Sequence, residues 1–268
     1  MDTIIEFEHV RKAYDDKVVL HDFSLTVEKG TFLTIVGASG GGKTTVLKLV
    51  NGLLMPDGGT IHVMGQDTQH TDLIALRRHI GYAIQGSVLF PHMTVEENIA
   101  YVPNLLNKKD KARTKAAVAK WMDIVGLDSS LLTRYPSELS GGQQQRVGIA
   151  RSLAASPELL LMDEPFGAVD EITRRSLQQE IARIHRETGI TVLFVTHDIS
   201  EALRLGTHVL VMADGRLQQY ATPEQILRAP ATDFVRRLVT NERHTCTLPD
   251  DHLDDCPYSG AATAKKEG

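Results

Sequence analysis

Short apolar runs alternate with amphipathic segments along most of this chain. Continuous apolar runs at 32–36, 159–162 and 191–195 are typical of parallel strands that are covered on both faces. Residues 46–50 and 176–186 show instead the one-sided apolar spacing of helices. Strands and helices in this order predict an α/β fold.

Other elements are expected in the first hundred residues. Residues 4–10 alternate well enough to predict an edge strand, and the runs at 18–20 and 23–27 predict more strand. Further on, residues 72–80 predict a helix with its apolar positions on one side, and residues 81–85 predict a short strand.

The pattern becomes helical from Gly86 to about Glu158. Thr94 is the expected N-cap of one helix, and the charged pattern from Lys108 to Val125 predicts a second helix that ends at Gly126. We interpret residues 86–158 as a helical insert.

The last hundred residues hold a hairpin signal, two short helices and a segment without pattern. Asp214-Gly215 separates the segments 209–212 and 217–220, and Thr222 and Thr232 are the expected starts of the helices. Beyond residue 240 periodicity is lost, so we expect residues 1–240 to form the folded domain and 241–268 a disordered tail. The tail holds residues able to bind Zn²⁺, although their spacing fits no common zinc finger: His244, Cys246, His252 and Cys256.

Composition narrows the functional classes. The chain has 268 residues, 42% of them apolar, and a net charge of −5 with both signs interspersed, so a nucleic-acid partner is not expected. No apolar run approaches the roughly 18 residues that span a bilayer, and the first residues lack the basic and apolar regions of a signal peptide. These features predict a protein that stays on the cytosolic side.

A glycine-rich segment between an apolar run and a helix carries the strongest chemical signal. It fits the pattern G-x-x-x-x-G-K-[ST], which cradles phosphate because its backbone N–H groups and the following helix end face one anion. Lys43 then supplies a charge for the β- and γ-phosphates, and Thr44 a hydroxyl for Mg²⁺. The candidate phosphate loop comprises Gly37, Ala38, Ser39, Gly40, Gly41, Gly42, Lys43, Thr44 and Thr45.

Two carboxylates and a histidine follow the other apolar runs. Asp163 suits a carboxylate associated with Mg²⁺, and Glu164 suits a base that orients and deprotonates a water. His197 follows the run at 191–195, and ligands of α/β sheets gather at this edge, which favours contact with the γ-phosphate over a purely structural histidine.

Two further positions leave a choice open. Ser140, followed by two glycines, begins either a second anion-binding helix or an ordinary capped helix. Tyr14 lies in a loop about two dozen residues before the phosphate loop, where an aromatic ring either stacks on adenine or simply packs.

Taken in order, these motifs resemble the nucleotide-binding subunit of an ABC transporter. The resemblance extends over about residues 4–240 and rests on the phosphate loop, Gln85, Leu139-Ser140-Gly141-Gly142-Gln143, Leu160-Leu161-Met162-Asp163-Glu164, Asp170 and His197. It implies a P-loop NTPase core of the RecA-like type, with an N-terminal antiparallel β subdomain and the helical insert at 86–158 as a subdomain.

The resemblance also implies roles for these residues, with ATP and Mg²⁺ bound. Tyr14 would stack on adenine, Gln85 would touch Mg²⁺ and report to the membrane partner, Glu164 would be the base, and His197 would contact the γ-phosphate. Ser140 and Gly142 would contact the nucleotide held by a second cassette, with Asp170 passing signals between the two. Two copies of the chain would thus close two ATP molecules between them.

A finer resemblance points to importers of quaternary amines such as glycine betaine, choline or carnitine. It rests on residues 84–99, 102–106 and 229–235, although Gly86 stands where that group often has a second glutamine and Val169 where leucine is commoner. The chain is also too short for the paired C-terminal sensor domains that several such subunits carry.

The resemblance implies a place in a larger assembly. Expected partners are membrane-spanning permease subunits, an extracytoplasmic substrate-binding protein and a second cassette, at the cytoplasmic face of the membrane. A different transported substrate, export, or a non-transport ABC ATPase acting on nucleic acid or ribosomes are the alternatives.

Overall fold

The computed structural model describes residues 2–15, 17–84, 89–107, 110–167 and 170–240, and two sheets organise this part of the chain. The larger sheet has the strand order β10-β9-β3-β8-β7-β6, in which β10 pairs antiparallel with β9 and the other neighbours are parallel. This topology confirms the α/β fold. The strands of the larger sheet are β3 (Phe32–Gly37), β6 (Ile80–Ala83), β7 (Leu159–Asp163), β8 (Thr191–Val195), β9 (His208–Ala213) and β10 (Arg216–Ala221).

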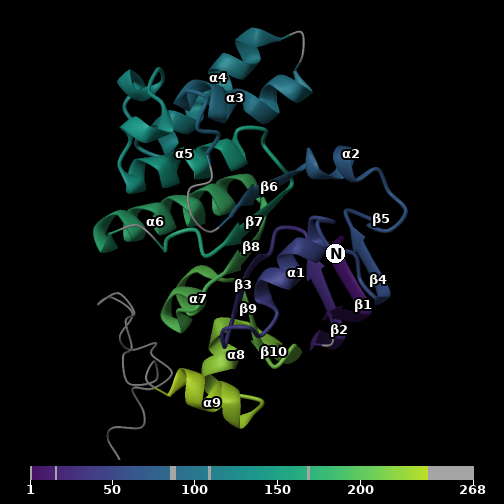
Figure 1. Cartoon of the computed structure of the whole chain (residues 1–268). Helices are drawn as coiled ribbons and strands as arrows, with labels where there is room; N and C mark the ends of the chain where they lie inside the picture. The colour runs from purple at the N-terminus through teal and green to yellow at the C-terminus, as the bar shows by residue number, and fades with distance from the viewer. Residues whose placement is uncertain (1, 16, 85–88, 108–109, 168–169, 241–268) are drawn as a thin grey trace, which may run out of the picture.

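The smaller sheet is antiparallel and belongs to the first part of the chain, drawn in purple to blue in Figure 1. Its order is β2-β1-β4-β5, so the prediction of an edge strand at residues 4–10 is wrong: β1 is hydrogen-bonded on both sides, to β2 and to β4. The strands are β1 (Thr3–Tyr14), β2 (Lys17–Glu28), β4 (Gly58–Val63) and β5 (Gln66–Asp67).

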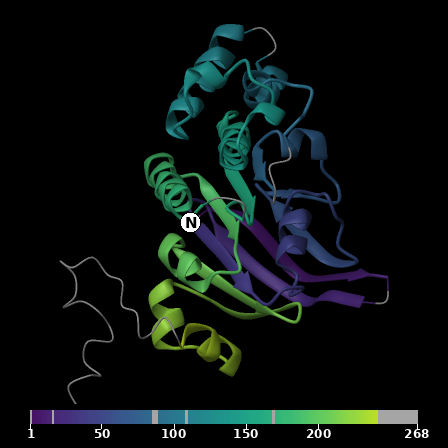
Figure 2. The same cartoon turned by 60° about the vertical axis from the view of Figure 1, so that its left-hand side comes forward.

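Helices cover the larger sheet and extend beyond it. In Figures 1 and 2 the teal helices α3, α4 and α5 lie at the far end of the molecule from the yellow α8 and α9. The helices are α1 (Lys43–Val50), α2 (Leu73–Arg77), α3 (Val95–Leu106), α4 (Lys111–Ile124), α5 (Gly141–Leu153), α6 (Glu171–Thr188), α7 (Ile199–Leu205), α8 (Pro223–Arg228) and α9 (Asp233–Val239), with short 3₁₀ turns at Ser129–Leu131 and Pro136–Glu138.

Helix boundaries follow local capping chemistry. Thr94 accepts a hydrogen bond from the N–H of Glu97 while the Glu97 side chain accepts from the N–H of Thr94, which confirms the expected start of α3. The helix predicted at residues 72–80 is shorter than expected, because α2 ends at Arg77 and Ile80 already begins β6.

The larger sheet separates two hydrophobic cores. Leu160 and Met162 of β7 face a core shared with α3, α4, α5 and α6, whereas Leu159 and Leu161 face a core shared with α1 and the smaller sheet. Neighbouring side chains of a strand point to opposite faces, so one continuous apolar run serves both cores. None of the helices described is long and apolar enough to span a bilayer.

Candidate functional site

The predicted site residues of the phosphate loop, β7 and β8 lie at one edge of the larger sheet. Gly37 ends β3, Asp163 ends β7, and His197 follows β8 by two residues. Strands β3, β8 and β7 are parallel neighbours in this order, so their carboxyl ends lie side by side. Ligands of open α/β sheets bind at such an edge.

The phosphate loop leaves β3 through a close backbone approach. Gly37 has φ +151°, and a Cβ at this position would lie 1.9 Å from the carbonyl oxygen of Met212 on β9. The loop then turns through Gly42, at φ +94°, directly into α1, which begins at Lys43. The first turn of α1 therefore presents its N–H groups toward the loop, where an anion is stabilised.

Lys43 lies inside the loop. Its buried ammonium group donates hydrogen bonds to the carbonyl oxygens of Gly37 and Ala38, each at 2.9 Å. Burial lowers the pKa of Lys43, and the nearby carboxylates of Glu164 and Asp163 oppose this change. A phosphate held in the loop would favour the charged form of the lysine in the same way.

Thr44 and Asp163 meet although they are far apart in the sequence. The Thr44 hydroxyl donates to Oδ1 of Asp163 at 3.1 Å, and Asp163 is buried. Burial raises the pKa of Asp163. Hydroxyl and carboxylate oxygens are the donors that Mg²⁺ prefers, so this pair fits the expected metal.

Glu164 and His197 form a second pair at the same edge. Nδ1 of His197 lies 3.5 Å from Oε2 of Glu164. The Glu164 backbone has φ +44°, which is rare outside glycine, and its N–H donates to the carbonyl oxygen of Val195 at 3.1 Å. Both residues line a pocket of about 120 Å³. A carboxylate held in a strained backbone beside a histidine is suited to orienting a water.

Tyr14 is the last residue of β1, so the prediction that it lies in a loop is wrong, and it lies next to the phosphate loop. Its ring is partly exposed, and its hydroxyl lies 3.5 Å from Oγ1 of Thr45. The preceding residue is fixed by Asp57, which accepts hydrogen bonds from the N–H of Ala13 and from Lys12, both at 2.7 Å. This position permits stacking on a base whose phosphates occupy the loop.

The remaining predicted residues are exposed helix starts or lie outside the described residues. Ser140 caps α5 by accepting from the N–H of Gln143 at 3.3 Å, and a Cβ on Gly142 would meet no described atom within 4 Å. Asp170 caps α6 by accepting from the N–H of Thr173 at 3.0 Å. The hydrogen bonds of the described residues do not join Ser140 or Asp170 to the phosphate loop. Gln85 and the tail positions lie outside the described residues.

Sequence reasoning missed the residues that complete this pocket. Arg174, Thr196 and Glu201 line it beside Glu164 and His197. Of these three residues, only Glu201 has a position that points to a role, because it is a carboxylate on the buried side of α7.

The fold and the site define a nucleoside triphosphate-binding protein. The family model described as "ABC transporter" matches residues 20–167. The chain belongs to this family, whose activity is ATP hydrolysis coupled to transport.

Individual relatives agree with this assignment. The chain is 49% identical to the glycine betaine uptake system ATP-binding protein YehX of Escherichia coli (strain K12) over 234 residues, or 87% of this chain and 76% of that protein. It is 44% identical to the glycine betaine/carnitine/choline transport ATP-binding protein OpuCA of Bacillus subtilis (strain 168), covering 92% of this chain and 65% of that protein. The chain thus spans less than two thirds of the OpuCA relative.

A solved structure supports the fold. The dimeric post-hydrolysis structure of the ATP-binding cassette MJ0796 with ADP and Pi matches with a TM-score of 0.76 and 30% identity, over 82% of this chain and 99% of that one. The resemblance to ABC nucleotide-binding subunits is therefore confirmed.

Proposed function

We propose that this chain is the ATP-hydrolysing subunit of an importer for a quaternary amine such as glycine betaine, choline or carnitine. The observation that supports the ATPase part most directly is the hydrogen bond between Thr44 and Asp163 at the sheet edge that also holds Lys43 and Glu164. This hydrogen bond joins the two residues proposed to hold Mg²⁺, and the lysine proposed to bind phosphate lies near both Asp163 and the proposed base.

Each residue at this edge has a separable task. Lys43 and the loop N–H groups bind the phosphates of ATP, and Thr44 with Asp163 would hold Mg²⁺, together with Gln85. When bound, Mg²⁺ neutralises charge on the phosphate oxygens. Glu164 orients a water and accepts its proton, and His197 contacts the γ-phosphate.

A second copy of the chain would complete the site. Ser140 and Gly142 at the start of α5 are proposed to contact the nucleotide bound to the other copy, and Asp170 at the start of α6 to link the two sites. The dimeric structure of the MJ0796 cassette supports this arrangement, and so does the exposure of both helix starts.

The transported substrate is proposed from relatives. Carnitine transport OpuCA of Listeria monocytogenes and choline transport OpuBA of Bacillus subtilis are 45% and 43% identical to this chain. A sulfate/thiosulfate import protein, CysA of Bradyrhizobium diazoefficiens, is 42% identical to this chain. The sequence identities to relatives with different substrates therefore differ by only a few per cent. Uptake of labelled betaine, choline, carnitine and sulfate in a deletion strain therefore decides the substrate, and loss of sulfate uptake alone would refute an amine.

The partners follow from the same proposal. The cassette would bind permease subunits at the cytoplasmic face of the membrane, in a complex with an extracytoplasmic substrate-binding protein. Co-purification with ribosomes or DNA, and not with membranes, would instead support a non-transport ABC ATPase.

The ATPase proposal is tested at the two ends of β7. Glu164→Gln should retain ATP binding and abolish turnover, because the amide cannot accept the proton of water. Glu158→Gln is the matched control, since Glu158 precedes the same strand and pairs with Lys29 at the surface. Wild-type hydrolysis by the Glu164→Gln variant would remove the base from this account.

A further inference from the structure

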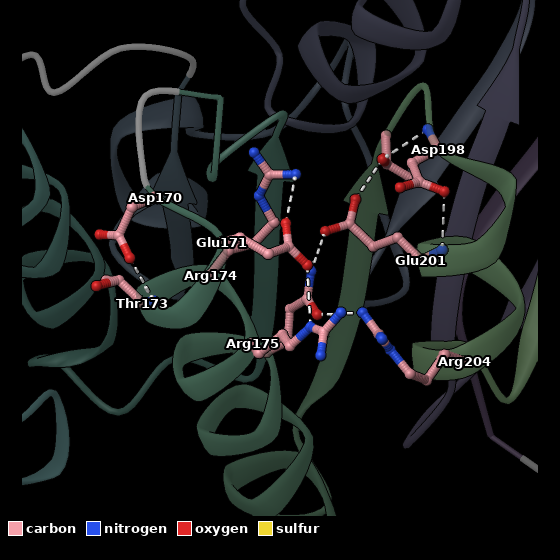
Figure 3. Close-up of polar contacts among 10 residues, drawn as sticks. Asp170, Glu171, Thr173, Arg174, Arg175, Asp198, Glu201 and Arg204 are labelled. Atoms are coloured by element: carbon pink, nitrogen blue, oxygen red, sulfur yellow. Dashed lines mark hydrogen bonds and ion pairs between the residues drawn. The ribbon is translucent and has the colours of Figure 1, made fainter. Parts of the chain in front are cut away.

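A chain of hydrogen bonds, buried except at its Arg204 end, lies directly behind His197 and joins α6 to α7. The carboxylate of Glu201 accepts from the Thr196 hydroxyl at one oxygen and from the Gln178 amide at the other, and the Arg204 guanidinium donates to the Gln178 amide oxygen. We call these four residues the Glu201 network. Figure 3 shows Glu201 and Arg204 of α7 facing α6.

The donors of the network converge on Glu201 from both sides. Arg204 and Thr196 donate at its two ends, and Glu201 is a double acceptor, as an ionised carboxylate is. Gln178, Thr196 and Glu201 are all buried, so a donor without an acceptor here would cost roughly 1–3 kcal/mol. Burial raises the pKa of Glu201, and the hydrogen bonds from Thr196 and Gln178 oppose this change.

The network fixes both residues that flank His197. The Thr196 hydroxyl, oriented by its donation to Glu201, accepts from the N–H of Asp198 at 3.0 Å. The Asp198 carboxylate in turn accepts from the N–H groups of Ser200 at 2.8 Å and Glu201 at 3.2 Å. The His197 backbone is thus held between two tethered neighbours, while its own side chain is exposed and 3.5 Å from Glu164.

We propose that Glu201 is a positioning residue for His197: with Thr196 and Gln178, it holds the loop after β8 in the geometry that brings the histidine to the γ-phosphate. Since Gln178 belongs to α6, the same contacts tie this loop to the helix that begins at Asp170. The inference rests on the proposed function of His197 and adds a residue that acts through the position of that histidine.

Because each hydrogen bond of the Glu201 network has a defined donor and acceptor, exchanging the side chains at positions 178 and 201 tests the proposal. In Glu201→Gln an amide replaces one acceptor oxygen with a donor. That donor either faces the amide donor of Gln178 or makes the Thr196 hydroxyl turn and accept, which leaves the hydroxyl proton without its acceptor. Adding Gln178→Glu restores every bond: the new carboxylate at 178 accepts from Arg204 and from the new amide at 201, whose oxygen accepts from Thr196. The single Gln178→Glu variant places two buried carboxylates together.

We expect Glu201→Gln to lower kcat for ATP roughly 10- to 100-fold with little change in KM, because misplacing a catalytic group affects the transition state more than binding. The double variant should recover most of this loss. Glu187→Gln, on the exposed side of α6 in an ion pair with Arg183, is the matched control and should behave as wild type. Full-length proteins are compared well below their melting temperatures, each checked by its unfolding curve.

A second measurement separates positioning from general stability. In a His197→Ala background, single-turnover hydrolysis should be the same with and without Glu201→Gln, because the effect of Glu201 passes through His197. Wild-type kcat in the single variant, a double variant no better than the single one, or an equal further loss in the His197→Ala background would each overturn the proposal. Failure of the ATPase proposal looks different, since Glu164→Gln would then retain turnover.

Discussion

The close approach at Gly37 predicts that a single methyl group there will disturb both the larger sheet and the phosphate loop. Gly37→Ala places a Cβ 1.9 Å from the carbonyl oxygen of Met212, where ordinary contact begins at 3.4 Å. That oxygen belongs to the backbone of β9, which pairs with Gly37 in the parallel ladder. No side-chain rotation relieves the overlap, so β3 and β9 must separate.

The size of the effect is the sum of two costs. Overpacking of a well-packed interior costs about 1–3 kcal/mol. A non-glycine residue at a sparsely populated backbone angle costs about 1–3 kcal/mol more. We therefore expect Gly37→Ala to lower the free energy of unfolding by about 2–6 kcal/mol.

The neighbouring Gly40 supplies the control. It also has positive φ, at +77°, yet a Cβ there would meet no described atom within 4 Å. Gly40→Ala therefore carries the backbone cost without the overlap. Urea unfolding should show Gly37→Ala to be less stable than Gly40→Ala by about 1–3 kcal/mol. Equal losses in the two variants would refute the argument from the Met212 contact.

Three further predictions concern other contacts. Thr34→Val should lower the free energy of unfolding by about 1–3 kcal/mol in urea, because the buried Thr34 hydroxyl donates to the carbonyl oxygen of Ala202 at 3.0 Å. Hydrogen bonds from Lys12 and Ala13 lower the pKa of Asp57, so Asp57→Asn should have a lower free energy of unfolding than wild type at pH 7. This difference in free energy should shrink as the pH falls through the lowered pKa of Asp57, and a difference independent of pH would contradict the prediction. Tyr14→Ala should raise the Kd for ATP roughly tenfold in a nucleotide titration while Tyr14→Phe does not, since base stacking is worth about 1–3 kcal/mol; equal Kd values for Tyr14→Ala and wild type would exclude stacking.

Features written into short stretches of sequence were predicted well. The capping residues Thr94, Ser140 and Thr222 each accept the expected hydrogen bond three residues on, because capping depends on neighbours in the chain. The alternation of buried strands and helices likewise gave the α/β fold.

Features that depend on distant partners were not predictable. The position of β1 inside its sheet depends on pairing with β4, some fifty residues later, and this pairing lies in the plane of the sheet, where alternation of side chains carries no information. The Glu201 network could not be predicted from the sequence for the same reason. Gln178 and Glu201 belong to different helices, and neither residue is part of a recognisable motif.

The strand order also has a consequence for how the protein is made. Thr44 and Asp163 meet across β8, which lies between β3 and β7 in the sheet but follows both in the chain. A growing polypeptide on the ribosome has therefore synthesised both residues of the proposed metal-binding pair before the strand that lies between β3 and β7 emerges. We therefore expect nucleotide to stabilise the nascent chain fully once residue 195 has left the exit tunnel.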